Sequence, residues 1–254
     1  MKKAMFFFTF FVLFLFSCSV TNKKIYEIEK RGKLVVGTSP PYGVMEFYEN
    51  NEIVGFDIDL AREIANRLNL DLEIKEVDFD KFYEALENDE IDLMIASVTI
   101  TKERNEKMEF SIPYFNGGQA IVSKKNFQNY EDLSGKKILI EDDGTKNKKK
   151  IFEYVKNFTA VFYAESYGKP YYEYSLEQIK NESIDAFVID YVAALDALKE
   201  NENLTIIDIF TDEYYGIAAK KGNTDLINKI NDILIDLKNE KVLENLKNKW
   251  VSNN

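Results

Sequence analysis

Residues 57–77, DIDLAREIANRLNLDLEIKEV, contain a change of hydrophobic period that decides the fold class. In the first part, the apolar positions 58, 60, 61, 64, 65 and 68 have the spacing of one face of a helix. Asp57 is available to cap that helix. Residues 72–77 then alternate between apolar and polar, which predicts a half-buried strand. A helix followed directly by a strand is the unit of an α/β fold.

The same unit recurs along the chain. Four further apolar runs predict strands: Lys33–Gly37, Ile91–Ala96, Lys137–Ile140 and Ala186–Ile189. Helical spacing recurs over 80–88, 175–181 and 225–237, and a last helix is expected to end at Trp250. Such a chain predicts mostly parallel sheets with helices on both faces. Because these sheets bind ligands at the carboxyl ends of their strands, candidate site residues lie in 38–44, 97–104 and 141–146 and at Asp190.

The composition excludes several classes of protein. The 254 residues include 33 Lys+Arg and 44 Asp+Glu, a formal charge of −11. This charge argues against a nucleic-acid partner, because neutralisation of phosphates dominates that kind of binding. The chain has no histidine and one cysteine, which excludes histidine-dependent triads, histidine metal sites, an internal disulfide and an iron–sulfur cluster. We therefore expect no metal and no cofactor.

The N-terminus has the form of a secretion signal. After two lysines, an apolar run over 5–16 is too short to span a bilayer. The run ends LFSC, which resembles a lipoprotein lipobox and implies removal of residues 1–17 and lipidation of Cys18. The alternative is an ordinary signal peptide with an incidental cysteine. In the first case residues 18–32 form a lipidated tether, and in both cases we expect the mature protein outside the cytoplasmic membrane.

The remaining motifs resemble the family 3 extracellular solute-binding proteins of polar amino-acid ABC transporters. The resemblance extends over about residues 34–250 and rests on landmarks that occur in order: LVVGT (34–38), VGFDIDLAREIANRL (54–68), DFDKFYEALENDEIDLMIASVTITKERNEKMEFSIPYF (78–115), LSGKKILIEDDGT (133–145), IDAFVID (184–190), EYYGIAAKKG (213–222) and NKW (248–250). It implies the two-lobed periplasmic-binding-protein fold, a Venus flytrap of type II with two hinge crossovers. Residues 33–118 and 210–254 would form lobe 1, and residues 119–209 lobe 2.

A site for a free amino acid must match a carboxylate and an ammonium, both of which are costly to desolvate. Arg104 can clamp a carboxylate through two parallel hydrogen bonds. Ser97 and Thr99 add hydroxyl donors shortly before it in the sequence. The resemblance implies that these residues hold the α-carboxylate or the α-amine. The alternative for Arg104 is a solvated arginine at a helix start.

The resemblance also implies ligand contacts elsewhere. It assigns the α-ammonium to Asp190 and the aromatic walls of the site to Tyr42 and Phe79. Thr145 would offer a hydroxyl and the amide of a helix N-terminus. The alternatives are a helix cap for Asp190 and core positions for the two aromatic residues.

Departures from the family pattern bear on specificity. Lys146 opens a lysine-rich run after the turn at Gly144. It either binds an anionic or strongly polar ligand group or belongs to a solvated surface cluster. Ser39 also varies with the ligand in the family, and its neutrality favours an uncharged polar or acidic amino acid. We interpret Asp57 and Asp59 as structural residues of a helix start.

These features imply a binding protein and not an enzyme. The expected cycle is capture of a free amino acid between two closing lobes and delivery to the permease subunits of an ABC transporter. The alternative is a periplasmic enzyme on the same fold, such as a cyclohexadienyl or arogenate dehydratase, which would need a general acid in the cleft. A sensory receptor domain is less favoured, because such domains are fused to a membrane helix and a signalling module.

Overall fold

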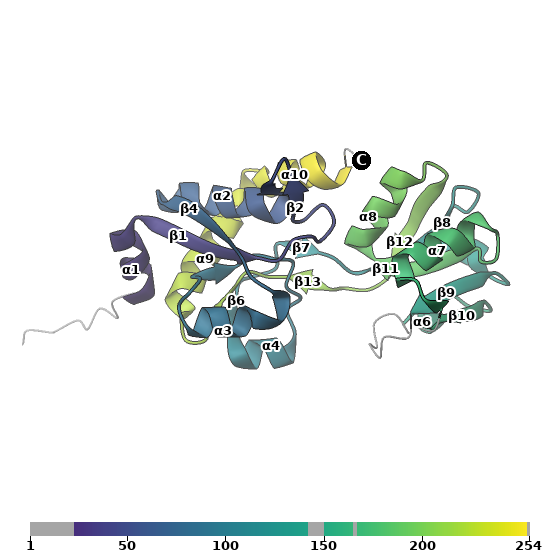
Figure 1. Cartoon of the computed structure of the whole chain (residues 1–254), viewed down its shortest axis with the longest axis horizontal. Coiled ribbons are helices and arrows are strands. Elements are labelled where there is room, and N and C mark those ends of the chain that lie inside the picture. Colours follow the sequence, from purple (N-terminus) through teal and green to yellow (C-terminus); the bar gives the residue numbers. More distant parts are fainter. Residues whose placement is uncertain (1–22, 142–149, 165–166, 253–254) are drawn as a thin grey trace, which may run out of the picture.

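The computed structural model describes residues 23–141, 150–164 and 167–252. These residues form two lobes, each built around a five-stranded sheet and joined by two crossover segments (Figure 1). The strand order is β4-β1-β5-β14-β6 in lobe 1 and β10-β9-β11-β8-β12 in lobe 2. The predicted two-lobed α/β fold with two crossovers is confirmed.

The sheet of lobe 1 brings three strand ends to one edge. Its strands are β1 (Lys33–Thr38), β4 (Asp71–Glu76), β5 (Leu93–Met94), β6 (Met108–Phe110) and β14 (Ala218–Lys220). β1 pairs in parallel with both β4 and β5, whereas β14 is antiparallel to β5 and β6. The predicted strand 91–96 is shorter than expected because β14 pairs with it at Leu93 and Met94 only.

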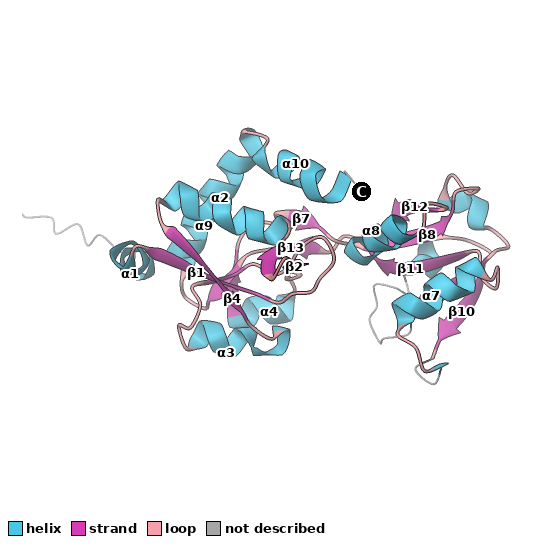
Figure 2. Ribbon diagram, turned by 45° about the horizontal axis from the view of Figure 1, so that its top comes forward, coloured by secondary structure: helices cyan, strands magenta, loops and turns pink. Residues whose placement is uncertain are grey.

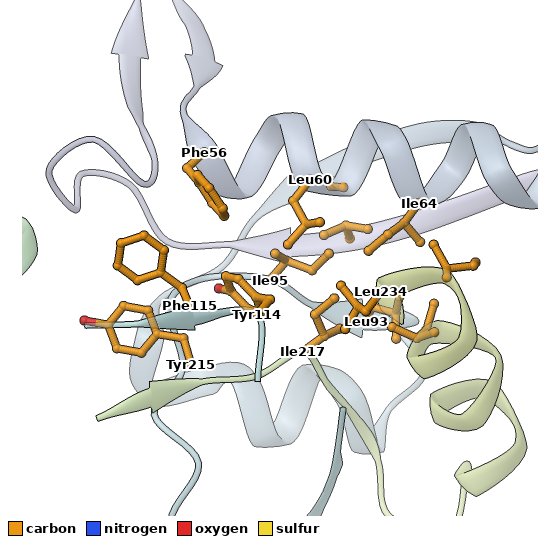
Figure 3. Close-up of a cluster of buried hydrophobic side chains, with 14 of the residues drawn as sticks. Phe56, Leu60, Ile64, Leu93, Ile95, Tyr114, Phe115, Tyr215, Ile217 and Leu234 are labelled. Carbon is orange, nitrogen blue, oxygen red and sulfur yellow. The ribbon is translucent and has the colours of Figure 1, made fainter. Parts of the chain in front are cut away.

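Helices cover both faces of this sheet. Lobe 1 contains α1 (Lys23–Arg31), α2 (Phe56–Leu68), α3 (Phe82–Glu87), α4 (Lys102–Lys107), α9 (Thr224–Asn239) and α10 (Val242–Lys247). Figure 2 shows α2 and α10 on the side of the sheet opposite to α3 and α4. Figure 3 shows Phe56, Leu60 and Ile64 of α2 packed towards the sheet, which is the helical face that the apolar spacing predicts.

The start of α2 differs from the expectation. Asp57 was expected to cap the helix, but Gly55 occupies the cap position with φ 137°. A side chain at Gly55 would lie 2.2 Å from the carbonyl oxygen of Met45, so this position requires glycine. Asp57 lies in the first turn, where its carboxylate is directed to Ser97.

Lobe 2 has the same layered design. Its strands are β8 (Gln119–Lys124), β9 (Lys137–Glu141), β10 (Thr159–Tyr163), β11 (Ala186–Asp190) and β12 (Leu204–Ile209), and its helices include α6 (Ile151–Tyr154), α7 (Tyr171–Lys180) and α8 (Tyr191–Glu200). β9, β10 and β11 are parallel, while β8 runs antiparallel to β11 and β12. Asp190 therefore ends a central strand and directly precedes α8.

The two crossovers lie side by side between the lobes. The short strands β7 (Phe115–Asn116) and β13 (Tyr214–Tyr215) pair with each other before the chain passes into lobe 2 through 117–118 and returns through 210–213. A side-chain carbon on Gly118 would lie 1.9 Å from the carbonyl oxygen of Thr211. This close approach of the two backbones needs glycine at position 118.

The N-terminal part of the described chain belongs to lobe 1. Residues 23–31 form α1, and Ile25 and Ile28 are buried in the core of lobe 1, so the tether expected over 18–32 is helical from residue 23 onward. Among the described helices, none combines the length and the apolar character that crossing a bilayer requires. The apolar run 5–16 and Cys18 lie outside the described residues.

Candidate ligand-binding site

A cavity of about 500 Å³ lies at the carboxyl ends of β1, β4 and β5. Six of the nine predicted ligand-binding residues line it: Ser39, Tyr42, Phe79, Ser97, Thr99 and Arg104. Pro40, Pro41, Glu46 and Ala96 complete the lining. The parallel strands bring these residues together because each contributes the segment that follows its last residue. All the lining residues belong to lobe 1.

Arg104 is the cation of this cavity. It lies in the first turn of α4, where its backbone N–H donates to the Thr101 hydroxyl at 3.1 Å. Its Nη1 donates to the carbonyl oxygen of Thr99 at 2.9 Å, and its guanidinium lies over the Phe79 ring, 5.3 Å from the centroid. Burial lowers the pKa of the guanidinium, which nevertheless stays charged. In the described part of the chain no carboxylate pairs with Arg104, so its remaining donors are available to an anion.

Ser97 presents an acceptor to the cavity. Its φ of 51° is unusual for serine, and Asp57 fixes this conformation. The Oδ2 atom of Asp57 accepts from the backbone N–H of Ser97 at 2.7 Å and from its hydroxyl at 3.0 Å. The hydroxyl proton is therefore committed, and what remains for a ligand is the lone pairs of Oγ. A hydroxyl donor was expected here, so the polarity of this contact is reversed.

A second carboxyl group lies beside Asp57, and the sequence reasoning did not identify it. Glu46 lines the cavity but is only 1% exposed, and its side chain is hydrogen-bonded to Asp57. Burial, followed by the charge of Asp57, raises the pKa of Glu46 to about 11. Burial also raises the pKa of Asp57, but hydrogen bonds from Glu46, Tyr114 and Ser97 oppose that shift. At neutral pH the pair holds one proton on Glu46, and Asp57 is the anion.

Two aromatic side chains form walls of the cavity. Phe79 is 44% exposed, which does not fit the alternative of a core residue, and it contacts Phe82 edge to face. The hydroxyl of Tyr42 lies 3.1 Å from that of Tyr215 on β13. Burial, followed by the charge of Asp190, raises the pKa of Tyr42 above its ordinary value. Both phenols are therefore neutral.

Asp190 lies beyond the cavity lining, on lobe 2. It occupies the cap position of α8 but makes no side-chain capping hydrogen bond, so the alternative of a helix cap does not describe it. Its Oδ1 instead accepts from the side-chain amide of Gln119 at 2.5 Å. The lobes meet near this point, where a side chain on Gly43 would lie 2.5 Å from Val192 of α8. Thr145 and Lys146 lie outside the described residues.

The chain is similar to proteins that bind amino acids. Residues 34–253 match the model of the bacterial extracellular solute-binding proteins, family 3. The arginine-binding extracellular protein ArtP of Bacillus subtilis is 29% identical over 86% of this chain and 86% of its own length. The L-cystine-binding protein TcyJ of Escherichia coli is 30% identical over 88% of this chain and 84% of its own length.

Solved structures show the same similarity. A mutant of the arginine-binding protein ArgBP from T. maritima is 36% identical, with a TM-score of 0.61 over 90% of this chain and 99% of that one. The ancestral amino-acid-binding protein AncCDT-1, a precursor of cyclohexadienyl dehydratase, is 29% identical, with a TM-score of 0.63 over 89% of this chain and 98% of that one. Both likenesses extend over the two lobes.

Proposed function

The chain belongs to the bacterial extracellular solute-binding proteins of family 3, and we propose that it binds a free amino acid between its lobes and delivers it to an ABC transporter. One observation carries the amino-acid assignment. The Arg104 guanidinium lines an open cavity, lies on the Phe79 ring and has no carboxylate partner in the described part of the chain. A partly buried cation without an anion is costly, and a ligand carboxylate would offset that cost.

The binding roles follow from the polarity of each group. The ligand carboxylate takes two donors of Arg104, and we assign it the hydroxyl of Thr99, which lines the same cavity. The ligand ammonium donates to the lone pairs of Ser97 and to Asp190. Tyr42 and Phe79 cover the side chain and exclude water, while Ser39, Thr145 and Lys146 are proposed as positions that tune specificity.

Closure follows from the distribution of these groups over the lobes. The cavity lining comes from lobe 1, whereas Asp190 comes from lobe 2. A ligand that reaches both binds the closed form more tightly than the open form, which is the condition for a ligand-driven closure. We place the moving units at 33–118 with 210–254 and at 119–209, and the hinges in the two crossovers.

The site of action is proposed from the N-terminal sequence and the family. Removal of residues 1–17 and lipidation of Cys18 would hold the protein at the outer side of the cytoplasmic membrane or at the cell surface. The permease subunits of the transporter are the expected protein partners. The named relatives are binding proteins, which favours transport over catalysis.

One observation favours a second candidate function. Glu46 is a protonated carboxyl group in the lining of the cavity, and a dehydratase acting on a cyclic carboxylic acid needs a general acid. Against this function, Glu46 is buried and its proton is shared with Asp57. Turnover of arogenate or prephenate by the purified protein, abolished by Glu46→Gln, would establish the enzyme; absence of turnover leaves the binding protein.

A thermal-shift screen against the free amino acids tests the main proposal. The protein is first unfolded and refolded to remove any ligand carried through purification. A ligand at a hundred times its Kd adds about 2.7 kcal/mol of stability, and each kcal/mol raises the Tm of a domain this size by roughly 2–4 °C. A shift with one or a few amino acids is expected. No shift with any of them would contradict the proposal.

A further inference from the structure

Gln119 joins two carboxylates at the point where the lobes meet. Its Nε2 donates to Oδ1 of Asp190 at 2.5 Å and to Oε1 of Glu213 at 3.0 Å. Asp190 ends the central strand β11, whereas Glu213 lies in the second crossover. Two carboxylates thus lie within hydrogen-bond distance of a single nitrogen, in an arrangement that sequence reasoning did not anticipate.

The second crossover holds Gln119 in this position. The backbone N–H of Gln119 donates to the hydroxyl of Thr211 at 2.7 Å, and that hydroxyl donates to Glu213 at 3.2 Å. Gln119 is only 3% exposed. Its amide orientation is determined, because the opposite one would place a carbonyl oxygen against two carboxylates.

The same amide group has an orphaned acceptor. Oε1 of Gln119 is buried and has no hydrogen-bond partner in the part of the chain that the structure describes. Both hydrogens of Nε2 are engaged by the carboxylates, so the groups left over at this point are all acceptors. A buried acceptor without a donor is costly, and the donor that suits carboxylates and a carbonyl together is a cationic N–H group.

Among the described residues, Asp190 and Glu213 have no cationic partner. Within the described ranges, no lysine or arginine forms an ion pair with Asp190 or Glu213. The facing groups are the neutral phenols of Tyr42, from the segment after β1, and of Tyr215, from β13. The charges of both carboxylates raise the pKa of each phenol, after burial as the main cause. Because Tyr42 lines the cavity, the carboxylates act at the edge of the ligand site.

We propose that Gln119 and Glu213, beside the Asp190 carboxylate that receives the α-ammonium, form a second cation subsite, and that the ligand is an amino acid with a positively charged side chain. The proposal rests on the function proposed above. Arg104 neutralises the ligand carboxylate. The α-ammonium of the ligand would balance only one of the two carboxylates, Asp190 and Glu213. A second cation on the ligand side chain balances the other when closure excludes water. This inference replaces the preference for an uncharged or acidic ligand that the neutrality of Ser39 suggested.

Arginine and citrulline test the proposal, because they have nearly the same shape and differ in the charge of the side chain. Calorimetry on the refolded protein should show arginine bound at least about 100-fold more tightly than citrulline. Glu213→Gln should reduce this ratio about tenfold or more, through weaker arginine binding and unchanged citrulline binding. Glu213→Asp, which keeps the charge, should retain most of the ratio.

Asp212→Asn is the matched control. It removes the same charge one residue away, and the new side chain can still accept the hydrogen bond that Asn116 donates to Asp212. The ratio of arginine affinity to citrulline affinity should not change.

Citrulline bound as tightly as arginine, or a ratio that Glu213→Gln leaves intact, would overturn the proposal while amino-acid binding stands. Failure of every amino acid to bind would instead reject the proposed function itself. If Glu213→Gln does not fold, a wild-type ratio below about tenfold overturns the proposal.

Discussion

At the scale of single residues, the proton shared by Glu46 and Asp57 decides how the site presents its polar groups. Asp57 accepts hydrogen bonds from the backbone N–H and the hydroxyl of Ser97, so only the lone pairs of the Ser97 hydroxyl remain for a ligand. Arg104 supplies charged donors to the same cavity. The proposed amino acid would thus meet acceptors at Ser97 and donors at Arg104, which would fix its orientation.

The role of Arg104 can be separated from stability. Arg104→Ala should weaken amino-acid binding by about 100-fold or more, because the mutation removes the only charged donor among the described residues of the cavity lining. The Tm of the free protein should stay nearly constant, since the guanidinium makes one hydrogen bond to a carbonyl and lies on a half-exposed ring. Calorimetry and thermal unfolding measure the two effects. The affinity of Arg104→Lys should lie between those of the natural chain and Arg104→Ala. Unaltered affinity in the alanine variant would contradict the carboxylate clamp.

The proton on Glu46 predicts a dependence of stability on pH. Burial raises the pKa of Glu46 from 4.5 to about 11, so above about pH 4.5 the folded chain keeps a proton that the unfolded chain releases. The stability that this proton contributes is complete below that pH and declines as the pH rises towards 11, by up to about 1.4 kcal/mol per pH unit. Glu46→Gln keeps an N–H donor towards Asp57 and has no proton to lose. Urea unfolding at pH 5, 7 and 9 should show the variant gaining on the natural chain as the pH rises.

Asp57→Asn is the comparison for this experiment. It removes the anion that accepts from Ser97 and Tyr114, and should cost about 2–4 kcal/mol of unfolding free energy at pH 7. The loss should exceed that of Glu46→Gln. The reverse order would contradict the assignment of the negative charge to Asp57, and parallel pH curves for Glu46→Gln and the natural chain would show that the folded pair keeps no extra proton.

Sequence reasoning at this scale located residues of the cavity lining where they follow a strand. Ser39, Ser97, Thr99 and Arg104 were predicted from their places after β1 and β5, and all four line the cavity. Glu46 lies just before the hairpin of β2 (Phe47–Glu49) and β3 (Glu52–Val54), and it was missed because its immediate sequence resembles that of the exposed Glu49. Burial distinguishes the two, and burial depends on the packing of the hairpin against α2.

At the scale of elements, the proposed closure of the lobes depends on the two crossovers. They run so close together that Gly118 leaves no room for a side chain against Thr211. Gly117 is equally restricted, since a side-chain carbon there would overlap the ring of Tyr215 at 2.0 Å. The hydroxyl of Tyr215 also lies within hydrogen-bond distance of the hydroxyl of Tyr42. Tyr215 therefore connects the first crossover to a wall of the cavity.

Gly118→Ala tests the importance of that spacing. The backbone of Gly118 is not in the left-handed region, so an added methyl group is opposed by the close approach alone. We expect a loss of about 1–3 kcal/mol in unfolding free energy, because the crossovers must separate. Affinity for the amino acid should fall as well. Urea unfolding and calorimetry check the two effects, and a variant with the stability and affinity of the natural chain would show that the crossovers separate freely.

The boundaries of elements were predictable where one face is buried. The helix expected over 225–237 is α9, Thr224–Asn239, and the helix expected over 175–181 is the end of α7. The first turn of α7 was missed because its tyrosines carry no clear period. Tyr171 is buried there and donates to the carbonyl oxygen of Val188, a contact that only the folded lobe creates.

At the scale of the whole molecule, ligand binding should be visible as compaction. The described residues that line the cavity lie on lobe 1, whereas Asp190 and Gln119 lie on lobe 2, so a ligand that reaches both lobes draws them together. Small-angle scattering should show a smaller radius of gyration with a bound amino acid. Asp190→Asn should bind more weakly and, even when saturated, compact less. Equal compaction in the variant and the natural chain would remove Asp190 from the closing contact.

The sequence by itself determined the fold class, the family and most of the cavity lining. The hydrophobic period and the order of residues are local properties of the chain. Residues that follow a strand stay at its end, so parallel pairing of the strands brings them to one edge of the sheet. The tertiary structure alone decided the polarity of Ser97, the proton on Glu46 and the union of Asp190 with Glu213. These depend on contacts between residues 40 and 94 positions apart, such as Asp57 with Ser97 and Gln119 with Glu213. Such contacts arise from the packing of whole elements and leave no periodic trace in the sequence.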